Sequence, residues 1–559
     1  MAKVPIIDGE YVLIIRKKTY FVIAFFALVS LGIWAFLCPD CSLHFVRVFP
    51  SVSFAPYRHG QSPFLERYPT PSEMEEDIAG FVREPRALAI RTYSSREGLE
   101  QVPRLAQKHA LTVYQGAWLT SQRKPDGAPT FNDLEISSAI RLANAYPETV
   151  RCVIVGNEVL LRGELTPKEL IEYIHQVKSS VSQPVTYADV WAFFERYPEV
   201  GRAVDILTIH ILPYWEDEPV SSEKAIAHVL WVYERMQSLF PGKQIFIGEI
   251  GWPTKGRSRG AAVPSLKNSI EFSHAVSTLA GEKSFDFNWV EAFDQPWKSQ
   301  IEGTVGANWG IFNADRHAKA ENCTSLAYVA ALLGAILALF GQNKHWKNIA
   351  FAQLIASLLI VHADYVTSIA YTPLETTWAW ARIVLYCLFT GLLWRVNQKM
   401  QQAARGFFSL YVVAALFNTF LFLLDGRYRD IPTLEFLIPS IGVLAYALAI
   451  PPVLSWKSLS LSRIFPRRST YDPISPKRAS ILLITAMAVG PLSESWALSR
   501  GEDFLHLHPT WLDRIPLLLD ALVANQEMLG WSAMLGCMAI PYLLEWNPFR
   551  RVVDKTYVF

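Results

Sequence analysis

The chain has 559 residues, 51% of them hydrophobic, and its mean hydropathy is positive. A chain this long and this apolar is not a single soluble domain, so we expect a membrane part beside a water-exposed part. The net charge of +1 gives no general attraction to nucleic acid, and six cysteines are too few for a disulfide scaffold.

The first predicted element is an apolar run over residues 20–38, which three basic residues at 16–18 precede. A cleaved signal peptide would carry a small-residue cleavage site after the run, and none follows, so the pattern favours an uncleaved signal anchor with a cytoplasmic N-terminus. Cys38 and Cys41 come at the end of this run. A redox site is one interpretation of the pair, but its βαβ context is missing, and an incidental or structural disulfide is favoured.

Short apolar runs then alternate with helical stretches between residues 50 and 300. The predicted strands are Val52–Tyr57, Leu88–Tyr93, Leu111–Trp118, Val153–Val155, Val185–Val190, Ile206–Ile211, Gln244–Gly248 and Phe287–Phe293, and the helical intervals include Asp133–Ala145, Pro167–Val181 and Ile226–Leu239. Eight strands alternating with helices over about 250 residues predict a (β/α)8 barrel. Active sites of such barrels lie where the strands end.

Two glutamates come directly after short apolar runs that read as buried strands. Glu158 closes the run that begins at Arg151, and Glu249 closes the run that begins at Gln244. The first would follow the fourth strand and the second would end the seventh, on opposite sides of the barrel mouth. Two carboxylates in this arrangement can flank one sugar bond and cleave or transfer it. The alternative is that each is an ordinary surface residue after a strand.

Five motifs accompany these strand ends: PYRHGQSP at 56–63, RTYS at 91–94, VGNEVL at 155–160, GEIGWP at 248–253 and EAFDQPWK at 291–298. From about residue 53 to residue 312 the chain resembles glycoside hydrolase family 17, the β-1,3-glucanase family. It is most similar to the bacterial membrane-anchored branch, which includes rhizobial proteins implicated in β-(1→3),(1→6)-glucan synthesis. The resemblance implies that Glu158 is the general acid/base and Glu249 the nucleophile. Ile250 stands where the family usually has threonine, which leaves the nucleophile in place.

A retaining mechanism needs two carboxyls about 5–5.5 Å apart, one to attack the anomeric carbon and one to protonate the leaving oxygen. We therefore expect Glu249 to be ionised and Glu158 to be protonated before the first step. Asn157 is placed to bond the sugar 2-hydroxyl, an interaction that strengthens in the transition state.

The remaining candidates for substrate contact follow other strands, and aromatic faces among them can pack against glucose rings. They are Tyr57, Arg91, Tyr93, Tyr187, Asp189, His210, Tyr214, Trp215, Trp252, Glu291 and Lys298. For Tyr57, Arg91 and Tyr93 the alternative is ordinary packing and ion pairing. We expect Glu291 and Lys298 to form an ion pair that positions the nucleophile, with a structural pair as the alternative. No second His or Cys stands at ligand spacing from His210, so neither a metal nor another cofactor is expected.

From residue 325 onward the chain is apolar again, which predicts seven further spans at 325–341, 349–366, 378–394, 409–425, 432–455, 479–498 and 529–546. Basic residues gather in alternate loops, which predicts both termini inside and residues 39–324 outside. The predicted architecture is an α/β (β/α)8 TIM barrel joined to an all-α polytopic transmembrane domain, with about eight transmembrane helices in total. Its parts are an N-terminal signal-anchor segment (1–44), a catalytic barrel (45–320) and a seven-span domain (321–559).

Six ionisable residues fall within these spans, all near the predicted outer ends: His362, Asp364, Arg382, Asp425, Glu435 and Glu494. An interfacial belt of charges and aromatic residues is the simpler interpretation. A polar floor that guides a glucan chain is the alternative.

These patterns favour an inner-membrane enzyme whose barrel faces the periplasm and acts on β-glucan. A covalent glucosyl-enzyme resolved by water gives hydrolysis, and one resolved by a sugar hydroxyl gives transfer. Because a degradative enzyme could be secreted without seven further spans, we favour a retaining transglycosylase that rejoins β-1,3-glucan fragments, with a 1,6 bond as one outcome. The alternatives are a membrane-anchored hydrolase and a glucan-binding partner of a synthase or export complex. The lack of a nucleotide-sugar domain or phosphate-binding glycine loop argues against a processive synthase.

Overall fold

The computed structural model describes residues 9–37, 43–81, 85–121, 130–319, 323–340, 345–394, 398–426, 428–449, 456–465 and 474–546. The chain divides into two compact units, one of residues 42–320 with 498–516 and the other of residues 1–41, 321–497 and 517–559. The predicted boundaries at 44 and 320 stay predictions. Cys38 and Cys41 lie outside the described residues, so their pairing does too.

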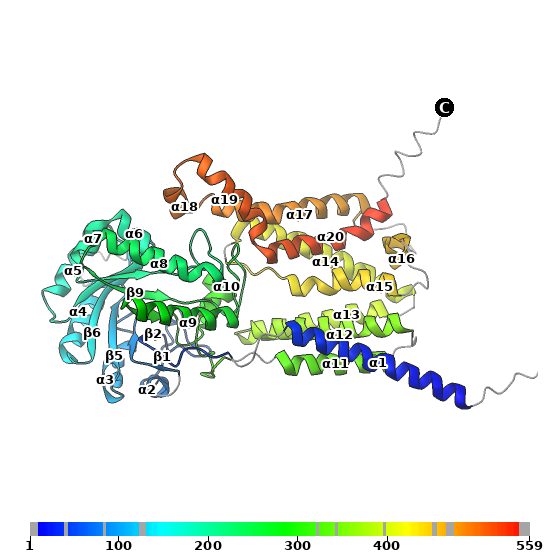
Figure 1. Cartoon of the computed structure of the whole chain (residues 1–559), viewed down its shortest axis with the longest axis horizontal. Helices are drawn as coiled ribbons and strands as arrows, with labels where there is room; N and C mark the ends of the chain where they lie inside the picture. Colours follow the sequence, from blue (N-terminus) through cyan, green and yellow to red (C-terminus); the bar gives the residue numbers. More distant parts are fainter. Residues whose placement is uncertain are drawn as a thin grey trace, which may run out of the picture. The chain divides into compact units, whose positions relative to one another are not determined.

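Eight parallel strands of the first unit close into a barrel in the order β10, β2, β4, β5, β6, β7, β8, β9 (Figure 1). Each coincides with a predicted strand, so the (β/α)8 fold is confirmed. Their bounds are β2 Ser51–Ser53, β4 Ala89–Arg91, β5 Thr112–Ala117, β6 Val150–Asn157, β7 Val185–Val190, β8 Ile206–His210, β9 Gln244–Ile250 and β10 Asp286–Trp289. A separate parallel pair is formed by β1 (Val48–Phe49) and β3 (Arg86–Ala87).

Helices alternate with these strands along the chain. They are α2 Pro71–Gly80, α3 Val102–Lys108, α4 Phe131–Ala145, α5 Pro167–Lys178, α6 Trp191–Arg196, α7 Pro198–Ala203, α8 Ser222–Leu239, α9 Leu266–Lys283 and α10 Ser299–Ala307, with short 3-10 turns η1 Pro63–Leu65, η2 Leu99–Gln101 and η3 Pro296–Lys298. Three of the helices begin with a capping box, in which a threonine and an acid three residues later satisfy each other's backbone N–H groups. The pairs are Thr70 with Glu73, Thr130 with Asp133 and Thr166 with Glu169.

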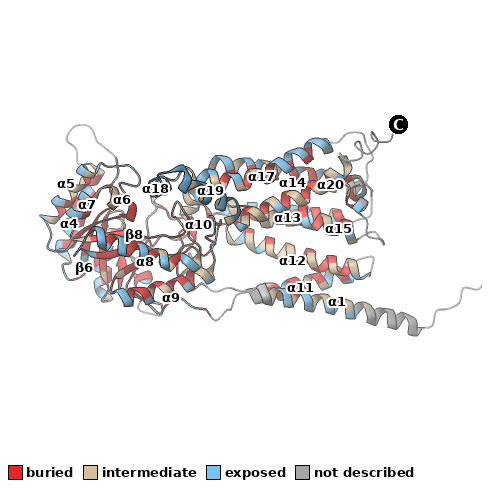
Figure 2. Ribbon diagram, turned by 45° about the horizontal axis from the view of Figure 1, so that its top comes forward, coloured by how far each residue is buried: buried red, intermediate tan, exposed pale blue. Residues whose placement is uncertain are grey.

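Buried residues concentrate on the strands and on the inward faces of the helices (Figure 2). Inside the barrel, a small apolar cluster that includes Cys152 and Ile154 of β6 lies toward the strand beginnings. Within it Tyr114 and Phe246 stack with ring centroids 4.5 Å apart. In barrels of this kind the active site lies at the opposite end, where the strands finish.

The second unit is helical. Its elements are α1 Gly9–Leu37, α11 Cys323–Phe340, α12 Trp346–Ser368, α13 Pro373–Trp394, α14 Gln398–Asp425, η4 Thr433–Phe436, η5 Ile438–Gly442, α15 Val443–Ala449, η6 Trp456–Leu459, α16 Leu461–Ile464, α17 Pro476–Leu498 and α20 Gln526–Trp546. Among the described residues, five helices are long and apolar enough to cross a membrane, and three shorter apolar helical stretches at 19–34, 325–339 and 433–449 accompany them. All eight predicted spans overlap one of these segments, and the number that crosses a membrane stays a prediction.

Two regions after residue 430 differ from the expected pattern. The predicted span at 432–455 starts as a 3-10 turn followed by a π-helical turn around Pro439, since proline has no N–H for the regular α-helical bond. Between α17 and α20 the sequence predicted no structure, yet α18 (Glu502–Leu507) and α19 (Trp511–Ala524) form there. Both are too short for the hydropathy pattern of a span.

Three of the six ionisable residues predicted near the outer ends of the spans lie close together. The ring of His362 stacks on Tyr386 with centroids 4.1 Å apart, and Arg382 bonds Glu435 at 3.3 Å. The Tyr386 hydroxyl accepts from the backbone N–H of Ile438 at 3.0 Å. These contacts tie α12, α13 and the irregular segment together within the helical unit, and they leave both interpretations of the polar residues open.

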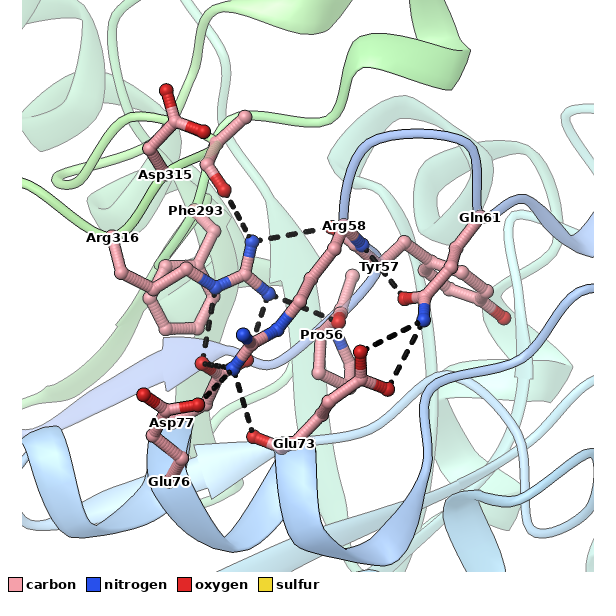
Figure 3. Close-up of polar contacts among 12 residues, drawn as sticks. Pro56, Tyr57, Arg58, Gln61, Glu73, Glu76, Asp77, Phe293, Asp315 and Arg316 are labelled. Carbon is pink, nitrogen blue, oxygen red and sulfur yellow. Dashed lines mark hydrogen bonds and ion pairs between the residues drawn. The ribbon is translucent and has the colours of Figure 1, made fainter.

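The segment after β2 is fixed by a buried carboxylate, as Figure 3 shows. Arg58 binds Oδ1 of Asp77 at 3.0 Å, Arg316 binds Oδ1 at 3.0 Å and Oδ2 at 2.7 Å, and the Asp77 side chain has 0% exposure. Burial raises the pKa of Asp77, and the two guanidinium groups oppose that rise. Arg316 also donates to the carbonyl of Pro56 at 3.0 Å. Helix α2 and the segment that carries Tyr57 are therefore joined through one acid.

We predict that Asp77→Ala destabilises the barrel by about 3 kcal/mol, because it leaves two partly buried guanidinium groups without their shared partner. Thermal unfolding of the full chain, followed by tryptophan fluorescence, measures the loss. The control is Glu75→Ala on the same helix, which removes an exposed pair with Lys108 and should leave the transition unchanged. Equal transitions for Asp77→Ala and wild type would contradict the assignment.

Candidate active site

The two predicted carboxylates lie together at the barrel mouth. Glu158 follows β6 directly, and Glu249 lies in β9 one residue before its end. One oxygen of each and a ring nitrogen of His210 all lie within 4.8 Å of one another. This closest approach of the two carboxylates is nearer to the separation of about 5–5.5 Å in retaining glycosidases than to the roughly 6.5–9.5 Å in inverting ones.

The turn that carries Glu158 needs backbone conformations that most residues avoid. Gly156 has φ +91°, and a Cβ there would come within 2.8 Å of the Val159 side chain, so only glycine fits. Glu158 itself has φ +52°, in the left-handed region. Its N–H donates to the carbonyl of Ala188 on β7 at 2.8 Å, which holds the turn against the neighbouring strand.

Two further residues of β7 hold the same turn. The Tyr187 hydroxyl accepts from the N–H of Leu160 at 2.9 Å and donates to Asp189. Both side chains are fully buried. Burial, together with the nearby charge of Glu158, raises the pKa of Asp189 to about 7. The structure therefore places the predicted Tyr187 and Asp189 behind Glu158 and not on an open sugar platform.

Glu249 is held by a buried guanidinium. Arg91 is 1% exposed and donates to Glu249 Oε1 at 3.1 Å and to the carbonyl of Gly248 at 2.6 Å. The Tyr93 hydroxyl donates to the same Oε1 at 3.0 Å, and burial raises the pKa of Tyr93, so the phenol keeps its proton. Two donors on one oxygen stabilise the ionised carboxylate that a nucleophile needs.

Asn157 is oriented by the same arginine. The second terminal nitrogen of Arg91 donates to Asn157 Oδ1 at 2.5 Å. With its oxygen engaged in this way, the amide presents its N–H₂ group as the donor that remains for a ligand. The geometry suits a bond to a sugar hydroxyl.

His210 lies between the two carboxylates and is 1% exposed. Its Nδ1 is 2.8 Å from Glu158 Oε1, and its Nε2 is 3.5 Å from Arg91 and 3.7 Å from Glu249. Burial alone would raise the pKa of Glu158, but the bond with His210 and the nearby positive charges outweigh it, and the pKa is lowered. The sequence led us to expect a protonated Glu158, whereas the bond with His210 favours the ionised form of Glu158, and the one proton of that bond lies between the two side chains.

The same cluster is the one described group of side chains with the spacing of a metal site. Arg91 lies 3.1 Å from Glu249 and 3.5 Å from His210, so its positive charge disfavours a cation among these side chains.

Glu291 and Lys298 form the ion pair expected from the sequence, with Glu291 1% exposed. Burial raises the pKa of Glu291 to about 7, against the opposing charge of Lys298. The N–H of Glu291 donates to the carbonyl of Trp309 at 3.0 Å. Another carboxyl, that of Glu302, lies near Lys298, and burial raises the pKa of Glu302 as well. Sequence reasoning missed Glu302 because it lies on α10, away from any strand end.

The predicted aromatic residues divide into buried and accessible ones. Trp252 and Tyr214 are completely buried, and each donates its polar hydrogen to a backbone carbonyl, of Val263 and Arg257 respectively. They support the mouth from behind. Trp215 is half-buried.

Two aromatic residues at the strand ends, Trp297 and Trp118, were not among the candidates from the sequence. Tyr57 meets Trp297 edge to face at 5.9 Å, and Trp297 meets the exposed ring of Phe64 at 5.5 Å. Trp118, at the end of β5, carries the guanidinium of Arg162 4.3 Å above its ring. The strand-end rule points to Trp118, and Trp297 lies within the quoted motif at 291–298, so the signal for both was present.

Comparisons with known proteins match the barrel. Residues 51–310 match the family model of the BtgE/BtgC glycoside hydrolase domain. A glucan 1,3-beta-glucosidase of Schizosaccharomyces pombe is 30% identical over 270 residues, which cover 45% of this chain and 82% of that protein. A glucan 1,3-beta-glucosidase of Candida albicans is 26% identical over 259 residues, covering 41% and 80%. A glycoside hydrolase family 17 beta-1,3-glucanosyltransferase from Rhizomucor miehei has 27% identity and a TM-score of 0.42, over 48% of this chain and 95% of that one.

We predict that Asp189→Asn changes how stability depends on pH. Because the folded-state pKa of Asp189, about 7, lies above its unfolded value of 3.8, the folded wild type loses stability as pH rises from about 4 to about 7. The variant lacks this loss. The difference between its unfolding free energy and that of the wild type should therefore rise by up to about 4 kcal/mol as pH rises from about 4 to about 7. Thermal unfolding of the full chain between pH 4 and pH 8 checks it.

The matched control is Asp286→Asn, a half-exposed acid paired with Arg151 on the same barrel. It should show the pH dependence of the wild type. The same curve for Asp189→Asn and wild type would show that the pKa of Asp189 is not raised.

Proposed function

We propose that this chain, which belongs to glycoside hydrolase family 17, is a retaining transglycosylase. It would cleave β-1,3-glucan and transfer the fragment to a glucan acceptor. The family acts by double displacement, through a covalent glycosyl-enzyme. The observation that carries the proposal is the cluster of Glu158, His210 and Glu249, whose reactive atoms lie within 4.8 Å of one another.

In the first step a carboxylate oxygen of Glu249 attacks the anomeric carbon, and the bond from that carbon to the bridging oxygen breaks. Both described bonds to Glu249 reach Oε1, so Oε2 is the oxygen we assign to the attack. The bridging oxygen takes the proton of the Glu158–His210 pair from Glu158. The products are a glucosyl ester of Glu249 and a released glucan with a new hydroxyl group.

In the second step an acceptor hydroxyl gives its proton to Glu158 while its oxygen attacks the anomeric carbon. The ester bond breaks, and Glu249 leaves as a carboxylate that Arg91 and Tyr93 stabilise. Water in place of the acceptor would give hydrolysis. Asn157, held by Arg91 through its oxygen, would bond the 2-hydroxyl of the sugar in both steps.

His210 has a specific part in this cycle. Without substrate, its bond lowers the pKa of Glu158, which is the wrong direction for an acid. A sugar that enters the mouth removes water from Glu158 and disfavours its charged form. The shared proton then moves onto Glu158 where it is needed, and His210 takes it back when the acceptor delivers it.

The preference for transfer comes from the membrane setting, together with the half-buried and exposed aromatic residues at the mouth. The five long apolar helices are compatible with a membrane-embedded region. We propose that the barrel lies in the periplasm beside the inner membrane, where it would remodel newly made glucan in the cell envelope. Bonds of the 1,6 type are among those it would form, and a glucan synthase or export complex is the partner we would look for.

The reaction is tested with β-1,3-gluco-oligosaccharides and the full chain in detergent. Products longer than the substrate, with linkages determined by methylation analysis, are expected. Glu249→Gln should abolish all products. Glu158→Gln should lose about 10²- to 10⁴-fold on glucan but keep its first step on an aryl glucoside whose acidic leaving group needs no proton. Only shorter products would mean that the protein is a hydrolase.

The topology is tested in whole cells. Green fluorescent protein fused after residue 559 should fluoresce, because the C-terminus is predicted to be cytoplasmic. Glu75→Cys places a thiol at an exposed position of α2, and in spheroplasts it should gain label from a membrane-impermeant maleimide relative to wild type. No gain would contradict a periplasmic barrel.

A further inference from the structure

A segment between two candidate membrane spans is built into the barrel. Residues 498–516, which include α18, follow α17 in sequence but belong to the compact unit of the barrel. We call these residues the strap. Phe504 of the strap is 0% exposed, and Leu507 packs against the core of the barrel.

Charged contacts fix the strap at both ends of α18. Arg196, the last residue of α6, bonds Asp503 at 2.6 Å and Glu502 at 2.9 Å. The N–H of Asp503 donates to Asp217 at 2.8 Å, and His508 bonds Glu218 at 2.6 Å.

The approach of the strap is close as well as charged. A Cβ at Gly501 would lie 2.8 Å from the carboxyl carbon of Asp217, so a larger residue would push the strap away. The strap and the loop of Asp217 therefore pack closely against each other at Gly501, in addition to their polar contacts.

On the barrel side, the strap contacts Arg196 at the end of α6 and one loop, residues 211–221, between β8 and α8. Three consecutive acids of this loop each hold a different partner. Glu216 accepts from the ring N–H of Trp191 at 3.2 Å and bonds His228 at 3.1 Å, while Asp217 and Glu218 bind the strap. The strap therefore binds two of these three acids, Asp217 and Glu218.

The loop carries Trp215 next to these acids, and Trp215 leads back to the reaction centre. Its ring stacks on Trp309 with centroids 6.3 Å apart and an angle of 21°. A Cβ at Gly251 would lie 3.3 Å from the Trp309 ring, and Gly251 comes two residues after Glu249. We call Trp215 and Trp309 the aromatic wall. Trp309 is 4% exposed and Trp215 is half-buried, so the ring of Trp215 is the accessible face of this wall.

We propose that the strap is a positioning element that holds the aromatic wall in place and thereby sets how tightly the barrel binds a β-1,3-glucan chain. This rests on the function proposed above. An aromatic face stabilises a sugar ring only if it is already in position, because ordering a loose loop on binding costs affinity. Arg196, Asp503 and His508 act through Trp215 and touch no substrate themselves.

The test measures binding of laminarihexaose by calorimetry to the full chain in detergent, in a Glu249→Gln background that cannot turn it over. Arg196→Glu should repel both strap acids and weaken binding about tenfold. The double variant Arg196→Glu, Asp503→Arg should restore most of the affinity, because it rebuilds the pair with reversed charges. His508→Gln, at a half-exposed position, removes the ion pair with Glu218 without introducing a repulsive charge. It should therefore weaken binding less than Arg196→Glu does.

The matched control is Arg235→Glu. Arg235 pairs with Glu195, the neighbour of Arg196 on α6, without contacting the strap, and its substitution should leave binding unchanged. In an otherwise wild-type background, Arg196→Glu should raise KM for laminarihexaose but leave kcat on an aryl glucoside unchanged.

Equal affinity of the background and both strap variants would overturn the proposal, and so would an equal loss in Arg235→Glu. If Arg196→Glu does not yield folded protein, His508→Gln decides alone. Failure of the Glu249→Gln background itself to bind laminarihexaose would instead refute the proposed function, so the two failures are distinguishable.

Discussion

A single buried guanidinium group organises the barrel mouth. Arg91 is 1% exposed and bonds Glu249, Asn157 and the carbonyl of Gly248, so it joins three strands that are far apart in sequence. A buried charge with no partner is strongly destabilising, and here the partner is the proposed nucleophile. The pair with Arg91 therefore holds the proposed nucleophile in place and explains how this carboxylate is tolerated at 7% exposure.

The other carboxyls of the mouth are held differently, and the difference separates their tasks. Glu158 bonds His210 and has a lowered pKa, whereas burial raises the pKa values of Asp189 and Glu291 to about 7. Several acids so close together cannot all be ionised at equal cost. The environment instead spreads their pKa values, with that of Glu158 lowered beside His210 while Asp189, whose pKa is raised, fixes the turn behind them. Such divergence is the usual mark of assigned acid and base roles.

The barrel and its two glutamates were predictable because both signals are local. A short β-branched run ended by glycine specifies a strand, and the residue that follows must lie at the mouth once the barrel closes. The burial of Trp252 and Tyr214 was not predictable, since both follow strands just as Trp215 does, and only packing from distant helices decides which ring stays accessible. The strap was missed for the same reason. Its contacts join residues about 300 positions apart, such as Arg196 and Asp503, and no local pattern records them.

The choice between transfer and hydrolysis depends on competition for the glucosyl-enzyme. Water is present at roughly 55 M, so an acceptor at about 1 mM can win only if it is bound next to the ester, where effective molarities can reach about 10⁵–10⁸ M. Glu158 and Glu249 treat both nucleophiles alike, so the selection must come from the surfaces that hold sugar rings beside them. The surface we propose for this is the ring of Trp215, which stacks on Trp309, and two of the three acids of the Trp215 loop are bound by the strap. A segment that lies between two candidate membrane spans in the sequence thus contributes to the feature on which the outcome of the reaction depends.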